Sequence, residues 1–288
     1  MVIYMQKTSI RFYNGIQVRA VWADDSNDWW YSATDLVAVL TESKNPRIYW
    51  NTLKTRNPKL NTFCRQLKLT SKDGKKYLSD VLNEQGIIEL LYLIPSKNNS
   101  RVQNWIKGMM DPIDEKSKRK AYDIFEGDII SNLEVGTFKG LQQIHSFIFG
   151  GLYEFAGQLR EKNISKGGFV FGNCLYLKDE LSKIDKMPEE TIKNVVDKYV
   201  EMNIAHPFME GNGRATRIWL DVILKNRFNK CVDWSLIDKN EYLHAMERSP
   251  YDSESIYRLI SNALTSDINN RELFMKGIDY SYYYEEIE

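Results

Sequence analysis

Hydrophobic and polar positions alternate over short stretches in the first third of the chain. Two such stretches, residues 10–13 and 17–22, flank Asn14-Gly15, a strong short-range signal for a β-hairpin. Further β-prone stretches lie at residues 29–31, 63–69 and 75–78. The spacing of apolar residues predicts helices over residues 34–41, from Pro46 onward, and over residues 83–93 and 101–110. Together these elements predict an α+β domain.

The pattern changes after residue 137, where apolar residues recur at the three- and four-residue spacing of helices. Residues 164–175 are predicted to form a small hairpin, and a helix is expected from Pro188 to about Ala205. Residues 111–127 are interpreted as a junction, because Asp111-Pro112 interrupts a helix and a mixed charge cluster follows. We therefore expect two domains, residues 1–112 and 113–288, the first α+β and the second mainly α-helical with a small β-hairpin.

The formal net charge of the 288-residue chain is zero, from 39 Lys and Arg and 39 Asp and Glu. Residues 1–120 carry 20 Lys and Arg against 12 Asp and Glu, and the rest of the chain carries 19 against 27. Two regions of opposite charge indicate two domains with different partners. The content of hydrophobic residues, 43%, is high enough to form real cores and argues against global disorder.

Several features place the chain in a reducing, aqueous compartment. It has no apolar run of the roughly 18–20 residues that a membrane span needs, so no membrane partner is expected. Its first residues lack a basic leader followed by an apolar block, so we expect no secretion signal. Cys64, Cys174 and Cys231 are scattered and fit neither a disulfide framework nor a zinc ribbon. These features predict a cytoplasmic protein.

Basic residues are concentrated between positions 47 and 76. They are Arg47, Lys54, Arg56, Lys59, Arg65, Lys68, Lys72, Lys75 and Lys76. In the helix from Pro46, the residues expected to face the core are Ile48, Trp50 and Leu53, with Arg47, Lys54 and Arg56 outward. The basic residues form either a solvated charged face or a surface that contacts the phosphates of a nucleic acid.

Three short sequence blocks in the first third of the chain are similar to a known domain. Residues 29–36 (WWYSATDL), 45–50 (NPRIYW) and 64–69 (CRQLKL) resemble the Bro-type N-terminal domain of viral and phage antirepressors. The resemblance covers about residues 8–110. It implies that residues 1–112 bind DNA or RNA, without assigning residues to base contacts.

The densest group of chemically useful residues lies in one short segment of the second half. Gly211-Asn212-Gly213 precedes a helix and can present successive backbone N–H groups to an anion. Arg214 and Arg217 share a helix face at that positive end, which favours a polyphosphate. Glu210 offers an oxygen ligand suited to Mg²⁺, and His206 is a candidate general base. Alternatively, the segment is a structural helix–turn–helix with a core histidine and surface arginines.

The same segment matches the pattern HxFx[DE]GNGRxxR, the signature of the Fic (filamentation induced by cAMP) family. Residues 153–160 are similar to the family's AG-x-x-R turn, and residues 164–169 are similar to its flap hairpin. The resemblance extends over residues 137–288. It implies a protein adenylyltransferase, which transfers AMP from ATP to a Tyr, Thr or Ser hydroxyl of a target protein and releases pyrophosphate.

The resemblance also assigns roles by motif position. His206 would deprotonate the target hydroxyl, Phe208 would anchor the loop, and Glu210 would hold Mg²⁺ between the α- and β-phosphates. Arg214 would bind the β-phosphate, Arg217 the γ-phosphate. The residues implied to bind the nucleotide are Lys166, Gly167, Gly168, Phe169, Asn203, Ile204, Ala205, Gly211, Asn212, Gly213, Arg214, Ala215, Thr216 and Arg217. The hairpin among them would cover the nucleotide and align the target segment.

The last ten residues contain four tyrosines and four acids, which is typical of a solvated or partner-binding tail. Ser281 and Glu285 also fit [ST]xxxE, the core of the Fic family's autoinhibitory motif. Residues four apart share a helix face, so Glu285 would reach Arg217 and occupy the guanidinium that the γ-phosphate needs. Glu286 stands where the family usually has Gly or Asn. Tyr282 is a candidate site of self-modification.

These observations predict an adenylyltransferase that uses ATP and Mg²⁺, is inhibited by its own C-terminal helix and has a nucleic-acid-binding N-terminal domain. Two alternatives stay open. The chain could use another nucleotide donor, or it could be an antirepressor-like regulator whose Fic domain only senses nucleotide. His206 and Glu210 argue against the second, because a sensor needs no general base. The oligomeric state is also open, since a self-inhibited enzyme could be regulated by forming a homo-oligomer.

Overall fold

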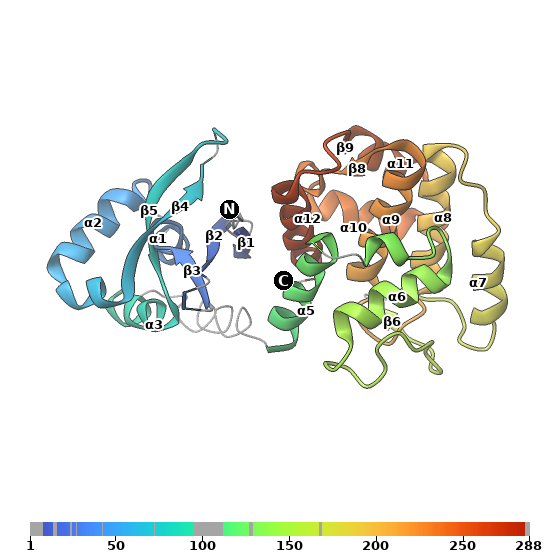
Figure 1. Cartoon of the computed structure of the whole chain (residues 1–288), viewed down its shortest axis with the longest axis horizontal. Helices are drawn as coiled ribbons and strands as arrows, with labels where there is room; N and C mark the ends of the chain where they lie inside the picture. The colour runs from blue at the N-terminus through green and yellow to red at the C-terminus, as the bar shows by residue number, and fades with distance from the viewer. Residues whose placement is uncertain are drawn as a thin grey trace. The chain divides into compact units, whose positions relative to one another are not determined.

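A computed structural model of the chain describes residues 8–13, 16–23, 25–26, 28–41, 43–71, 73–94, 112–126, 129–166 and 169–285. The chain separates at residue 112 into two units, residues 1–111 and 112–287 (Figure 1). The predicted helix over residues 101–110 lies outside the described residues, as do the turn Asn14-Gly15 and residues Asp111, Gly167, Gly168 and Glu286.

A five-stranded antiparallel sheet forms the centre of the N-terminal unit, in the order β1-β2-β3-β5-β4. Its strands are β1 (Thr8–Tyr13), β2 (Ile16–Ala23), β3 (Asp28–Ser32), β4 (Cys64–Thr70) and β5 (Lys76–Leu82). β1 and β2 pair from Thr8↔Val21 to Tyr13↔Ile16, which is the hairpin that the sequence pattern predicts. Val21, Leu69 and Val81 form a buried cluster on this sheet.

Helices accompany the sheet, and one of them departs from the predicted orientation. They are α1 (Ala33–Thr41), α2 (Pro46–Arg56), the 3₁₀ helix η1 (Pro58–Phe63) and α3 (Glu84–Leu93). Trp50 is buried on α2 as predicted, but Ile48 is 65% exposed and Lys54 pairs with Asp80 at 2.6 Å. At about 100° per residue, Ile48 points away from Trp50, so the two cannot share one buried face.

The C-terminal unit is mainly helical. Its helices are α5 (Pro112–Glu126), η2 (Ile130–Asn132), α6 (Phe138–Phe149), α7 (Leu177–Asp185), α8 (Ile192–Ala205), α9 (Asn212–Phe228), η3 (Trp234–Leu236), α10 (Lys239–Arg248), α11 (Glu254–Asn262) and α12 (Arg271–Tyr283). Two short antiparallel pairs complete it, β6 (Ser165–Lys166) with β7 (Phe169–Val170) and β8 (Cys231–Val232) with β9 (Leu264–Thr265). This arrangement confirms the predicted fold class, an α+β domain followed by a mainly helical one with a small hairpin.

α9 lies at the centre of this unit and contacts α6, α8 and α12. Most of its first thirteen positions are buried, including the polar side chains of Arg214, Thr216 and Arg217. A helix that is buried on all sides is a core element. None of the helices in the described part of the chain combines the length and apolar character that a membrane crossing requires.

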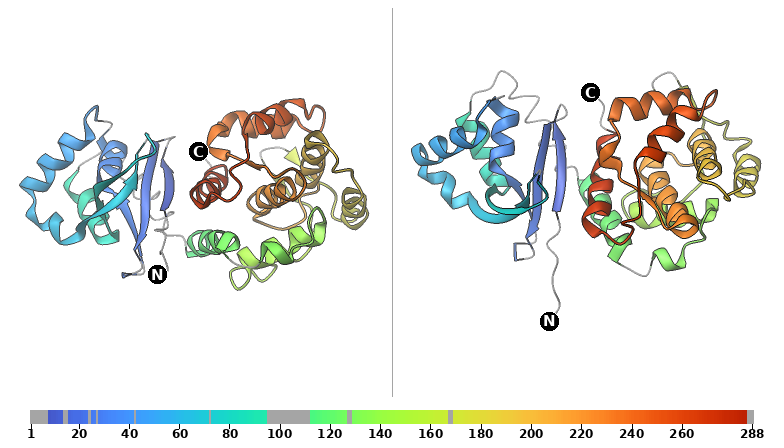
Figure 2. Two further views of the ribbon diagram at one scale, coloured as in Figure 1. Left: turned by 45° about the horizontal axis from the view of Figure 1, so that its top comes forward. Right: turned by 90° about the horizontal axis from the view of Figure 1, so that it is seen from above.

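Two predicted boundaries in this unit were wrong. The helix expected from Pro188 begins at Ile192, because Thr191 and Asn194 cap it reciprocally. Residues 112–126, interpreted as a junction, form the helix α5. Its Pro112 occupies the first helical position, acidic residues follow in the first turn, and its buried side packs along α12 (Figures 1 and 2).

Candidate active site

The loop between α8 and α9 is fixed by its own side chains. Phe208 is fully buried, and its ring stacks on that of His145 with centroids 3.8 Å apart. The Asn212 side chain accepts a hydrogen bond from Phe208 N and donates one to Phe208 O. The Asn212 side chain therefore fixes the backbone of this loop.

His145 and Arg160 brace this loop from outside the motif. His145 Nδ1 accepts from Gly157 N–H at 2.9 Å, so its Nε2 carries the proton and donates to Glu210 O at 2.8 Å. Burial lowers the pKa of His145 to about 4, which keeps this neutral form. Arg160 donates to the carbonyl oxygens of His206 and Ala205. Neither residue was assigned a role from the sequence, although Gly157 and Arg160 belong to the AG-x-x-R turn.

His206 ends α8 in the left-handed region, with φ 48° and ψ 65°. Its ring stacks on Phe171 at 3.7 Å, and its Nδ1 lies 3.2 Å from Asn203 O. Since a carbonyl oxygen only accepts, Nδ1 carries the proton and Nε2 keeps its lone pair. Burial lowers the pKa of His206 to about 4. At neutral pH the residue is therefore in the form that can accept a proton.

Glu210 and Arg214 lie together at the start of α9. Glu210 Oε1 accepts from Gly211 N at 3.1 Å and from Arg214 Nη2 at 2.9 Å, and the Glu210 side chain is 55% exposed. Arg214 is almost fully buried, and its Nε has no hydrogen-bond partner. Among the described residues no three His, Cys, Asp or Glu side chains form a metal cage. A single exposed carboxylate instead suits Mg²⁺ that is bound mainly through phosphates.

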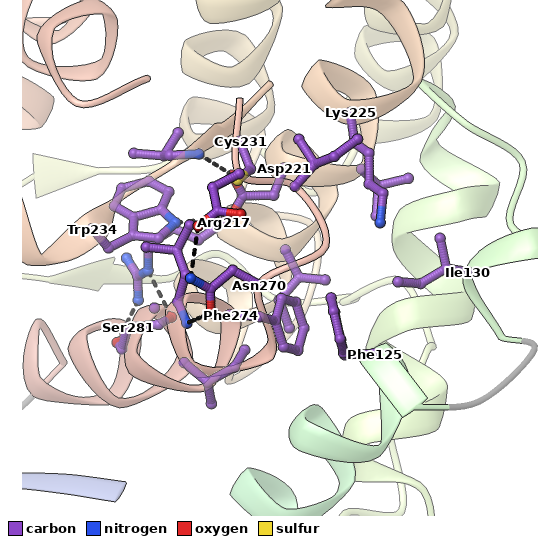
Figure 3. A pocket seen from close by; sticks show the side chains of 18 residues that line it. Phe125, Ile130, Arg217, Asp221, Lys225, Cys231, Trp234, Asn270, Phe274 and Ser281 are labelled. Atoms are coloured by element: carbon purple, nitrogen blue, oxygen red, sulfur yellow. Dashed lines mark hydrogen bonds between the residues drawn. The ribbon is translucent and has the colours of Figure 1, made fainter. Parts of the chain in front are cut away.

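Arg217 is occupied by α12. Its Nε donates to Ser281 Oγ and its Nη2 to Ser281 O, both at 2.7 Å (Figure 3). Nη2 also donates to Glu285 Oε1 at 2.6 Å. Glu285 Oε2 lies 3.1 Å from Lys166 Nζ, so the hairpin joins the same contact. Although burial acts to raise the pKa of Glu285, the charges of Arg217 and Lys166 lower it to about 2.

Glu285 also fills the space at the N-terminus of α9. A Cβ atom built on Gly213 would lie 2.1 Å from Glu285 Oε1, so the carboxylate lies directly against this backbone. A helix N-terminus carries partial positive charge and binds anions. The Glu285 carboxylate therefore occupies the place where the sequence predicts a phosphate group.

A cavity lies beside Arg217, which lines it together with residues such as Phe125 and Trp234 (Figure 3). Its volume is about 50 Å³. Pockets for drug-sized ligands usually span roughly 300–1,000 Å³, so this one is too small for a nucleotide. Burial raises the pKa of Asp221, on this wall, to about 7.

The remaining predicted site residues lie on the hairpin, on α8, on α9 and on α12. Lys166 and Phe169 lie on the paired strands β6 and β7, and Asn203 to Ala205 form the last turn of α8. Ala215 and Thr216 are fully buried beneath the loop, where the Thr216 hydroxyl donates to Asn212 O. Tyr282 is 8% exposed, and its hydroxyl donates to Ser117 Oγ at 2.7 Å.

A substitution at Gly211 tests how tightly the loop before α9 is packed. It has φ +77°, and a Cβ on it would lie 2.4 Å from the Phe149 ring. We expect Gly211→Ala to lower the free energy of unfolding by about 2–4 kcal/mol, from left-handed backbone strain plus overpacking. Gly151→Ala is the matched control, because Gly151 has φ +74° but open space around it, and should cost only about 1–2 kcal/mol. Equal losses in urea unfolding would contradict the packing argument.

Two family profiles match the chain. The Fic/DOC family matches residues 137–224, and the N-terminal domain of the BRO family matches residues 17–112. A protein adenylyltransferase, VbhT of Bartonella schoenbuchensis, is 29% identical over 154 residues, which is 48% of this chain and 32% of VbhT. A probable protein adenylyltransferase Fic of Escherichia coli is 24% identical over 143 residues, 46% of this chain and 71% of that protein. The chain thus spans about a third of the first relative.

Solved structures also share similarity with the chain. BepC of Bartonella tribocorum, determined with bound AMPPNP, has 18% identity and a TM-score of 0.46, covering 56% of this chain and 88% of that one. The effector protein BepA has 19% identity and a TM-score of 0.48, covering 59% and 66%. On the family matches and the site motif, the chain carries a Fic domain with protein adenylyltransferases among its relatives, preceded by a BRO-family N-terminal domain.

Proposed function

We propose that this chain is a protein adenylyltransferase that transfers AMP from ATP to a Tyr, Thr or Ser hydroxyl of a target protein. The observation that carries the proposal is the neutral His206, whose Nε2 lone pair is free, at the loop that leads into the N-terminus of α9. The Fic domain and the adenylyltransferases among its relatives support the same chemistry. The buried, unpartnered Nε of Arg214 adds a donor at the site of the β-phosphate.

In the proposed reaction, His206 Nε2 takes the proton of the target hydroxyl as its oxygen attacks the α-phosphorus. Pyrophosphate leaves, and AMP stays on the target oxygen. The backbone N–H groups from Gly211 to Gly213 and the α9 dipole stabilise the charge on the phosphates. Arg214 binds the β-phosphate and Arg217 the γ-phosphate. Glu210 would hold Mg²⁺, which when bound neutralises phosphate charge.

The hairpin β6–β7 would cover the bound nucleotide. Lys166 and Phe169 pair across it, and Phe171, next in the chain, stacks on His206. An exposed strand edge here can take an added target strand, which would deliver the hydroxyl to His206. The last turn of α8, Asn203 to Ala205, would contact the nucleoside.

We further propose that the structure is the inhibited state. Arg217 cannot bind a γ-phosphate while Ser281 and Glu285 occupy its guanidinium. The pKa of Glu285, lowered to about 2, keeps the carboxylate charged above pH 4.5, so acidification toward pH 5 does not release it. Self-modification of Tyr282 requires α12 to move first, because the Tyr282 hydroxyl is buried against Ser117.

The target and the donor are tested together by mass spectrometry of lysate proteins incubated with the Glu285→Gly variant, Mg²⁺ and a mixture of nucleoside triphosphates. AMP on a hydroxyl side chain is the expected adduct. Another nucleotide on the target would favour the alternative donor. No adduct on any protein, with tight nucleotide binding, would favour the nucleotide-sensing regulator.

A second function, nucleic-acid binding by the N-terminal domain, is favoured by its charge distribution. Residues 43–72 contain no Asp or Glu. Most residues of the helix α2, which lies in this segment, are exposed to solvent. They are Arg47, Ile48, Tyr49, Asn51, Thr52, Thr55 and Arg56. A helix with exposed basic and amide side chains fits a phosphate backbone and base edges. The match to the BRO family supports this proposal.

Charge reversal on α2 tests this surface. In the full chain, we expect Arg47→Glu/Arg56→Glu to weaken duplex DNA binding about tenfold or more at low salt and to reduce the salt slope by about 2. The matched control is Lys178→Glu/Lys183→Glu on α7, which changes net charge equally at two exposed positions. Equal weakening by both variants in a fluorescence anisotropy titration would mean that α2 is no specific contact surface.

A further inference from the structure

The helix α5 contacts the second nucleotide-site arginine. Asp114, in its first turn, accepts from Arg214 Nη1 at 2.7 Å. The Arg214 side chain is 6% exposed and that of Asp114 is 50% exposed. Arg214 Nη2 is taken by Glu210. Both terminal nitrogens of this guanidinium are therefore held by carboxylates, and α5 lies outside the residues that match the Fic family.

The same helix also holds α12 through buried polar groups. Asp279 of α12, 1% exposed, accepts from the Tyr122 hydroxyl and lies 3.6 Å from Lys118 Nζ. Ser117, fully buried on α5, accepts from the Tyr282 hydroxyl. A buried charge pair keeps two elements together strongly, since separating it leaves an unpaired charge. α12, which carries Ser281 and leads into Glu285, is thus bound along one side by α5.

We propose that α5 is a second inhibitory element, in which Asp114 occupies Arg214 as Glu285 occupies Arg217, and the residues behind it lock α12 in place. This proposal rests on the proposed function. An incoming β-phosphate is an anion and competes with a carboxylate for Arg214. Glu210 is needed for Mg²⁺, so Asp114, half-exposed in the first turn of its helix, is the group that leaves.

The alternative is that Asp114 positions Arg214 for the phosphate and stays there. The two roles predict opposite effects of the same substitution. A positioning carboxylate strengthens phosphate binding, so its removal weakens it. A competing carboxylate beside the phosphates repels them, so its removal strengthens phosphate binding.

α5, the helix that holds α12 in place, begins where the N-terminal unit ends. It is therefore covalently linked to that unit.

The first test uses Asp114→Asn in the full chain, with Asp123→Asn, an exposed carboxylate later on α5, as the matched control. We expect Asp114→Asn to bind ATP with Mg²⁺ about fivefold or more tightly by calorimetry, and to raise label transfer by a similar factor. Weaker or unchanged ATP binding overturns the proposal.

A second test measures how firmly α5 holds α12, without relying on catalysis. Tyr122→Phe keeps the ring but removes the hydroxyl that donates to Asp279. We expect hydrogen exchange in α12 to accelerate about fivefold or more, with exchange in α8 unchanged. Unchanged exchange in α12 contradicts the lock. ATP binding and hydrogen exchange can both be measured even if no variant transfers label. In that case the proposed function fails, and the inhibitory contact is judged by ATP binding and hydrogen exchange alone.

Discussion

Glu285→Gly is expected to raise the transfer of label from ATP to protein by about 10- to 100-fold. The Glu285 carboxylate accepts a hydrogen bond from Arg217 Nη2 at 2.6 Å and so occupies this guanidinium. A charge-assisted hydrogen bond contributes about 1.5–3 kcal/mol, and each 1.4 kcal/mol is a factor of ten in a population. Removing it frees Arg217 for the γ-phosphate and clears the space against Gly213.

The matched control for this change is Glu190→Gly, an exposed residue in the bend before α8. It should leave label transfer at the wild-type level. Thermal unfolding of both variants checks that each is folded. Equal or reduced transfer by folded Glu285→Gly would mean that the α12 contact is not inhibitory.

His206→Ala in the Glu285→Gly background is expected to lower label transfer by about 10²–10⁴-fold, the usual contribution of a general base. The structure leaves His206 Nε2 with a lone pair and the ring neutral, with its pKa lowered to about 4 by burial. ATP binding should change little, because the assigned phosphate contacts come from Gly211 and from α9, and none comes from the His206 ring. Transfer and binding are measured on the same preparation.

His244→Ala is the matched histidine control, since His244 is exposed on α10. It should retain full transfer. A His206→Ala variant that transfers label as fast as its parent would remove this histidine from the mechanism. Loss of ATP binding together with transfer would instead indicate a structural role for the left-handed turn.

The core of the candidate site was predictable because its residues are neighbours in the sequence. Glycines 211 and 213 before an apolar helical pattern indicate a helix N-terminus, and arginines three apart on that helix share its face. The contact between Glu285 and Arg217 spans 68 positions, yet it was predicted, since the family motif named both ends. Local chemistry and a known motif thus sufficed for this part.

The helix α5 could not be predicted in the same way. Its sequence is rich in charge, and the residues it buries include Ser117 and Lys118, which sequence patterns place on a surface. Lys118 can be buried because it pairs with Asp279. Asp279 lies on a helix more than 150 positions later in the chain, so the sequence around Lys118 does not reveal this pair. Asp114 and Arg214 are 100 positions apart. Long-range pairing of charges leaves no periodic pattern in either segment.

Cap chemistry and helix geometry account for the smaller errors. Pro188 is compatible with a helix start, but the reciprocal cap of Thr191 and Asn194 places the start at Ile192. Glu189, freed from the helix, pairs instead with Lys198 and Arg227. On α2, the exposure of Ile48 follows from the burial of Trp50 two residues later.

The central claim is tested most directly by giving Glu285→Gly two samples of ATP, one labelled at the α-phosphorus and one at the γ-phosphorus. Adenylyl transfer predicts that the α-label becomes covalently attached to protein, while the γ-label is released with pyrophosphate. Attachment of the γ-label alone would show phosphoryl transfer, and attachment of neither would show that the site binds nucleotide without transferring it. Either of these results would contradict the proposed adenylyltransferase.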